Sequence, residues 1–134
     1  MEKLIVGQMR EGITVNARLR WNATGLQVAP GESYRVQASS DLWHDAGIPA
    51  TADGQDGNMI QRIFKWTIRC KQARWFQLVG ALGQSDEQLF PLGIDAQLKV
   101  PPGPEAELTL FANDVLFMYG NNQGNIWVNI TRIA

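Results

Sequence analysis

The sequence predicts an all-β protein, folded as an antiparallel β-sandwich of about eight strands. Apolar and polar residues alternate along several short segments, turn residues separate these segments, and no segment has an unambiguous helical stripe. Short strands at regular spacing are typical of sandwiches. At 134 residues the chain is long enough to bury a core without cross-links, so we expect residues 1–134 to form one domain.

The first half of the chain has the clearest strand patterns. The apolar residues of the first predicted strand alternate with polar ones and are expected to share one face: Ile13, Val15, Ala17 and Leu19. Pro30-Gly31 suits the central positions of a type II turn between two further strands. Residues 41–58 lose periodicity and gather Asp, Gly and Pro, which predicts a long loop.

The second half begins with an ambiguous segment. Residues 59–72 fit a helical stripe through Ile60, Ile63 and Phe64, and also an alternating strand, of which we favour the strand. Further strands are predicted at 75–82, 94–100, 107–111 and 126–133.

Charge and composition exclude several classes of partner. The chain has twelve Lys and Arg and thirteen Asp and Glu, and its sequence contains no basic stripe. Nucleic acid is therefore not expected to bind. No apolar run reaches the roughly 18 residues of a membrane span, which predicts no membrane insertion. Without a visible signal peptide we expect a cytoplasmic protein, or one released to the cell surface or exterior by another route. The single cysteine, Cys70, is predicted to be a core or strand residue.

Side-chain oxygens are concentrated in residues 111–130, "FANDVLFMYGNNQGNIWVNI". This segment contains one Asp and four Asn, which are Asn113, Asp114, Asn121, Asn122 and Asn125. Hard cations such as Ca²⁺ prefer carboxylate, amide and carbonyl oxygens. Asn and Gly are also common wherever a chain reverses direction, so from spacing alone a cation site and an ordinary turn both remain open.

The same segment resembles a known family. "NDVLFMYGNNQGNIWVNI" is similar to the C-terminal signature of the calcium-dependent, galactose-binding bacterial lectins of the LecA (PA-IL) type, and "APGESYRVQAS" and "VPPGPEAELTLFAND" resemble earlier parts of that family. The resemblance implies a jelly-roll or galactose-binding-domain-like sandwich. It further implies a homo-oligomeric, non-enzymatic lectin that holds Ca²⁺ and recognises terminal galactose-type glycans.

The resemblance also implies roles for individual residues. It assigns the cation to the Asp114 carboxylate, to the side-chain oxygens of Asn121 and Asn122, and to two backbone carbonyls, those of Met118 and Trp43. Asp114 and Asn121 are further implied to hydrogen-bond to the sugar.

Two differences from the family pattern bear on the sugar. Leu116-Phe117 replaces the family's Pro-Gly in the loop. The family's second contact loop uses a His and a Gln, whereas "TADGQDGN" offers Gln55 with Asp53 and Asp56, and His44 is the only imidazole. We expect Gln55 and Asp53 to contact the sugar, and the Trp43 indole to stack on its apolar face.

Two other functions fit the same residues. One is a non-enzymatic interaction or structural module without calcium, in which Leu116 and Phe117 form a protein-contact patch. The other is a glycoside hydrolase with Asp114 paired with Asp53 or Asp56. A lectin is the preferred interpretation, because the family that the segment resembles is not enzymatic.

Overall fold

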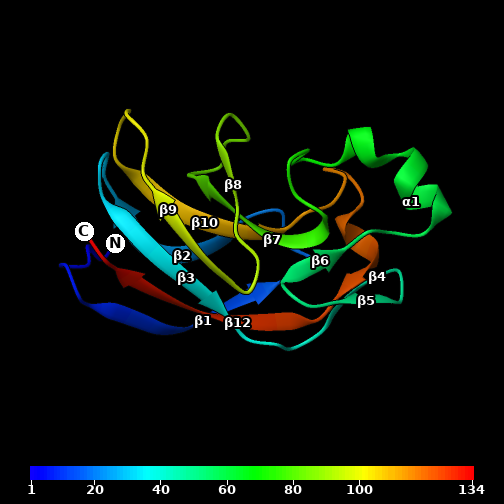
Figure 1. The fold of residues 1–134 in the computed structure, drawn as a ribbon, viewed down its shortest axis with the longest axis horizontal. Coiled ribbons are helices and arrows are strands. Elements are labelled where there is room, and N and C mark those ends of the chain that lie inside the picture. Colours follow the sequence, from blue (N-terminus) through cyan, green and yellow to red (C-terminus); the bar gives the residue numbers. More distant parts are fainter.

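The computed structural model describes residues 1–134, and its elements are almost all strands (Figure 1). One sheet has the order β1 (Met9–Asn16), β12 (Asn125–Arg132), β3 (Ser33–Ala38) and β9 (Asp95–Lys99). The other has the order β2 (Asn22–Val28), β10 (Ala106–Ala112), β7 (Trp75–Leu82) and β6 (Asp53–Gln55), with β8 (Leu89–Pro91) also paired with β7. All these strand pairs are antiparallel, which confirms the predicted fold class.

The core lies between the two sheets. Alternate residues of each sheet face inward, for example Val15 and Val128 from one and Leu26 and Leu108 from the other, and they belong to one cluster of buried side chains. Pairing of β1 with β12 brings two distant parts of the chain together in the first sheet. The apolar residues that alternate with polar ones in the sequence are therefore those that face the space between the two sheets.

Short elements close one end of the sandwich. A small sheet joins β11 (Asn122–Gln123), β4 (Trp43–Asp45) and β5 (Ile48–Ala50). Beside it lie the helix α1 (Met59–Ile63) and the 3₁₀ turns η1 (Lys65–Thr67) and η2 (Tyr119–Asn121). In Figure 1 this end of the molecule is opposite the two chain termini.

Three predictions from the sequence were wrong. Leu19 is 50 % exposed, because β1 ends at Asn16 and the chain then turns. Residues 41–58 contain β4, β5 and β6 where a loop was expected. Residues 59–67 form α1 and η1 where a strand was favoured, since Asn58 begins a helix there with a reciprocal pair of cap hydrogen bonds to Gln61.

Gly54 allows β6 to approach β7 closely. Its φ is 77°, and a Cβ at this position would lie 2.6 Å from the Trp75 carbonyl oxygen. We expect Gly54→Ala to cost about 2 kcal/mol or more, because the strained backbone and the overpacking add up. Gly31→Ala is the matched control, since its φ is 85° with open space around the Cβ. Urea denaturation measures both, and equal losses would contradict the packing argument.

Candidate functional site

A cavity of about 500 Å³ lies at the closed end of the sandwich, between α1, the β4–β5 turn and the segment that follows β10. Its size is in the range of small-molecule sites. Both polar and apolar residues line it. The polar residues include Asp45, Asn58, Gln61, Asp114 and Asn121. The apolar residues include Ile48, Ile60, Phe64, Trp66, Trp75, Val115, Phe117 and Met118.

Asp114 lies just beyond the end of β10 and is only 2 % exposed. Its Oδ1 accepts a hydrogen bond of 2.7 Å from the Val115 N–H, and its Oδ2 is buried without a hydrogen-bond partner. Burial, and then the negative charge of Asp45, raise the pKa of Asp114 to about 7. The Val115 N–H and the neighbouring Asn122 amide favour the charged form but offset only part of this rise.

Asp45 is a second buried carboxyl group at the same cavity. Its exposed fraction is 7 %, and burial raises its pKa. The Gln61 Nε2 donates a hydrogen bond of 2.7 Å to its Oδ2, which partly opposes that rise. Two carboxyl groups in one dry site repel each other when both are charged, which favours either a bound proton or a bound cation.

Asn122 contributes a second buried oxygen without a partner. The residue is fully buried, and its Nδ2 donates a hydrogen bond of 3.0 Å to the Ala17 carbonyl, which fixes the orientation of the amide. Its Oδ1 has no hydrogen-bond partner. Such atoms are rare in native proteins, where an ordered water, an ion or a ligand satisfies them. Two of the residues predicted to hold a cation, Asp114 and Asn122, thus each present one unpaired oxygen.

The other two predicted ligands in this segment, Met118 and Asn121, line the cavity together with Asp114, whereas Asn122 lies behind its lining. Asn121 is exposed, and its backbone carbonyl accepts a hydrogen bond of 3.2 Å from the Ala46 N–H. This bond links the segment to the β4–β5 turn. The structure therefore brings Asp114, Met118 and Asn121 to one cavity from a single stretch of chain.

Arg69 and Tyr119 hold this segment against the sandwich. The guanidinium carbon of Arg69 lies 3.5 Å from the ring centre of Phe111 and 4.2 Å from that of Trp21. Its Nη1 donates a hydrogen bond of 2.9 Å to the Tyr119 hydroxyl, which in turn donates one of 2.6 Å to the Ala112 carbonyl. Sequence reasoning missed both residues, because their contacts join positions far apart in the chain.

Asn113 also has a structural role. Its Oδ1 accepts a hydrogen bond of 2.9 Å from the Cys70 N–H, and its Nδ2 donates to the carbonyls of Cys70 and Arg74. All its amide atoms are therefore used within the protein. Cys70 itself is buried, as predicted.

Trp43 does not line the cavity. It is fully buried, and its Nε1 donates a hydrogen bond of 3.0 Å to the Phe76 carbonyl. The expected stacking of its indole on a sugar is therefore wrong. Ala46, three residues further along, does line the cavity and has an unusual positive φ of 48°. His44 pairs with Gln123 across β4 and β11 and is also absent from the cavity.

Asp53 and Gln55 likewise lie outside the cavity lining. The Asp53 Oδ1 accepts a hydrogen bond of 2.8 Å from the Ile94 N–H, and Gln55 pairs with Trp75 in the β6–β7 ladder. Asn58 and Gln61 line the cavity in their place. The Asn-x-x-Gln spacing of a capping box was the signal in the sequence that could have located them.

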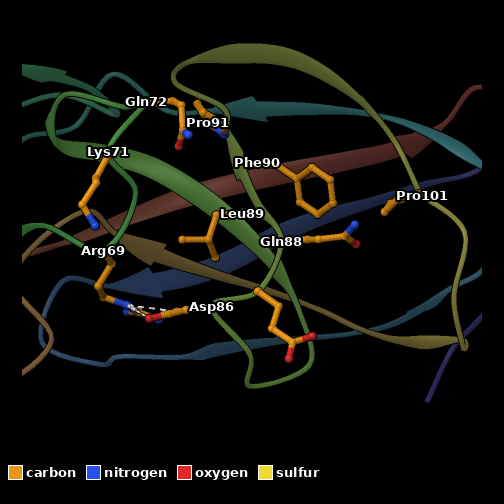
Figure 2. A pocket seen from close by; sticks show the side chains of 10 residues that line it. Arg69, Lys71, Gln72, Asp86, Gln88, Leu89, Phe90, Pro91 and Pro101 are labelled. Atoms are coloured by element: carbon orange, nitrogen blue, oxygen red, sulfur yellow. Dashed lines mark hydrogen bonds and ion pairs between the residues drawn. The ribbon is translucent and has the colours of Figure 1, made fainter.

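A second cavity, of about 510 Å³, lies on another part of the surface (Figure 2). Its lining mixes charges of both signs with Leu89, Phe90 and Pro101. The dashed lines in Figure 2 mark the contact between Arg69 and Asp86, whose closest atoms are 2.9 Å apart. None of the predicted cation or sugar residues lines this cavity.

Two further observations concern the helices and the metal-binding side chains of the chain. None of its helices has the length and apolar character needed to cross a membrane. No three His, Cys, Asp or Glu side chains gather where they could hold a metal ion. A cation at the first cavity would therefore rely on amide and carbonyl oxygens in addition to carboxylates.

Comparisons with known proteins show which solved structure has a similar fold. No protein-family model and no curated protein matches the chain. Among solved structures, the N-terminal domain of EclA, described as a PllA-like lectin, superposes with a TM-score of 0.67 at 23 % sequence identity. The match covers 92 % of this chain and 97 % of that one. The chain therefore shares the fold of that domain along nearly its whole length.

Proposed function

We propose that this protein is a calcium-dependent carbohydrate-binding lectin whose site is the cavity beside Asp114. One observation carries the proposal: Asp114 Oδ2 and Asn122 Oδ1 are buried without hydrogen-bond partners. An unpaired buried oxygen costs free energy, and an ionised one costs more. A cation held between such oxygens removes this cost, and a carboxylate with amide oxygens is the donor set that Ca²⁺ favours.

The proposed cation ligands are the side chains of Asp114, Asn121 and Asn122 and the carbonyl of Met118. For the remaining carbonyl we replace Trp43 with Ala46, because Ala46 lines the cavity and its N–H already bonds to Asn121. When bound, Ca²⁺ supplies coordination positions for two neighbouring sugar hydroxyls. Asp114 and Asn121 would also hydrogen-bond to those hydroxyls.

Asn58 and Gln61 are the proposed second polar contacts with the sugar. Both line the cavity, and the short helix that they cap holds them there. They replace Gln55 and Asp53 in this role. The resemblance to the LecA-type signature supports terminal galactose-type sugars as the ligand class.

The proposal includes no catalytic turnover. Asp53 and Asp56 are absent from the cavity lining, so neither forms the carboxylate pair expected of a hydrolase with Asp114. A small sugar offers few contacts, so single-site affinity is modest and assembly into a homo-oligomer would supply avidity. Incubation with aryl glycosides is expected to release no reducing sugar.

Calcium is expected to stabilise the protein at neutral pH. A ligand that binds only the native state at about 100 times its Kd adds about 2.7 kcal/mol to the free energy of unfolding. We expect the melting temperature to rise with CaCl₂ and to return to its starting value with EDTA. A titration with galactose by calorimetry should then give heat only in calcium, with glucose as the matched sugar control.

A calcium-independent interaction module is the second candidate. It is favoured by the exposure of Leu116 and Phe117, which are 42 % and 78 % exposed next to the cavity. Under this alternative, calcium does not change the melting temperature and no sugar on a glycan array binds in a calcium-dependent way. That result would reject the lectin proposal.

A further inference from the structure

We propose that the outer edge of the cavity docks onto the surface of a lipid bilayer that contains anionic lipids. This edge is formed by the exposed apolar side chains of α1, η1 and the segment after β10. We call it the apolar rim, and it consists of Met59, Ile60, Ile63, Phe64, Trp66 and Phe117.

The apolar rim is exposed to an unusual degree for large side chains. Met59 is 77 % exposed, Trp66 is 70 % exposed and Phe117 is 78 % exposed. The helix α1 buries none of its residues, whereas a surface helix normally packs an apolar stripe on the core. Ile60, Phe64, Trp66 and Phe117 line the same cavity, so the two segments of the rim lie together. Grouped exposed apolar residues mark an interaction surface.

The exposed charges that alternate with the rim residues are positive. Residues 57–67 and 115–118, which carry the rim, contain no Asp or Glu, and the two carboxyl groups that line the cavity beside it, those of Asp45 and Asp114, are buried. Arg62 and Lys65 alternate with the rim residues, are exposed, and form no salt bridge. Exposed Trp and Phe interleaved with Lys and Arg are typical of segments that lie in a membrane interface.

The same charges argue against a second copy as the occupant. A two-fold interface over the apolar rim would place Arg62 and Lys65 near their own copies, with no carboxylate on the rim to pair them. Anionic lipid headgroups complement these cations, and the interfacial layer accepts the apolar side chains.

The position of the rim suits a peripheral contact. It lies at the end of the molecule opposite the termini (Figure 1). The sequence predicted no membrane insertion, and no helix is long enough to span a bilayer. Side chains that reach only into the headgroup layer need no spanning segment. The contact involves none of the polar residues proposed to hold calcium or sugar, so it is independent of the proposed function.

Vesicle co-sedimentation tests the proposal. The full chain is mixed with phosphatidylcholine vesicles carrying about 30 % phosphatidylserine, without any glycolipid and in EDTA, so that sugar and calcium cannot contribute. We expect binding that weakens at about 0.5 M salt and that falls roughly tenfold without phosphatidylserine. Trp66→Ser and Phe117→Ser should each reduce binding about tenfold. Trp127→Ser is the matched control, because Trp127 is 50 % exposed on β12 and outside the rim, and it should bind like the unmodified chain.

Three outcomes would overturn the proposal. The first is that no vesicle binds the chain. The second is that Trp127→Ser weakens binding as much as Trp66→Ser. The third is a concentration-dependent dimer in sedimentation velocity that Trp66→Ser abolishes while vesicle binding is absent, which would assign the rim to a second copy. Far-UV circular dichroism and melting temperature show whether each variant is folded.

Discussion

Asp114→Asn is expected to stabilise the protein in EDTA at pH 8 and to abolish its response to calcium. In the folded chain the pKa of Asp114 is raised from its ordinary value of 3.8 to about 7, chiefly by burial. Near pH 4 to 7 the folded state therefore holds a proton that the unfolded state has lost. Stability from this group falls as the pH rises through that range and is lowest above pH 7.

Replacing the Asp114 carboxylate with a neutral amide removes the loss of stability that this charge causes above pH 7. The neutral amide should raise the free energy of unfolding by about 2–4 kcal/mol at pH 8 without calcium, and by much less at pH 4. Since the amide cannot supply the carboxylate charge, calcium should no longer raise the melting temperature. Denaturant titrations at both pH values, with calcium and with EDTA, measure the effect. A variant that is less stable at pH 8 in EDTA would refute the inferred raised pKa.

Calcium should reverse the pH dependence of the unmodified chain. The proposed calcium ion would bind the deprotonated Asp114, so calcium affinity should increase as the pH rises through about 7. The melting temperature should then fall from pH 4 to pH 7 in EDTA and change little, or rise, in calcium. Differential scanning calorimetry in both buffers gives the comparison.

Arg69→Ala is expected to cost about 3 kcal/mol and to weaken sugar and calcium binding at the same time. The Arg69 side chain is 2 % exposed, stacks on Phe111 and Trp21, and bonds to the Tyr119 hydroxyl. Removal leaves a void between two rings and a hydroxyl without its partner. Because Tyr119 lies within the segment that carries the proposed ligands, the site should loosen with it.

Arg35→Ala is the matched control for this change. Arg35 also pairs with a carboxylate, at 2.6 Å from Asp95, but both side chains are nearly half exposed. An exposed pair of this kind contributes about 1 kcal/mol or less. Urea denaturation and calcium titration of both variants test the difference. If the two variants lose the same stability, the cluster around Arg69 is not the anchor that we describe.

Most of the long strands could be predicted from the sequence, because alternation of apolar and polar residues follows directly from the burial of one face of a strand. The strand predicted at 75–82 coincides with β7, and those at 94–100, 107–111 and 126–133 coincide with β9, β10 and β12 to within one residue at either end. The region from 41 to 67 was predicted poorly. Its elements are only three to five residues long, too short for a period to be recognised, and local capping decided between helix and strand.

Only the part of the candidate site that lies in one continuous segment could be predicted from the sequence. Asp114, Met118 and Asn121 lie in one short segment whose pattern is visible in the sequence, and the structure brings them to one cavity. Asp45, Ala46, Asn58 and Gln61 come from the poorly predicted region, and only the folded chain places them beside that segment. Our proposal moves the second carbonyl from Trp43 to Ala46 because only Ala46 lines the cavity, which the sequence alone does not reveal.

The hydrogen bond from Asn122 to the Ala17 carbonyl has a consequence for biosynthesis. Ala17 immediately follows β1, and β1 forms its ladder with β12, which begins at Asn125. The amide therefore reaches its final orientation only after residues 125–132 have been translated and have paired with the beginning of the chain. If the proposed function holds, a nascent chain arrested on the ribosome before that point would be unable to bind calcium or sugar at this site.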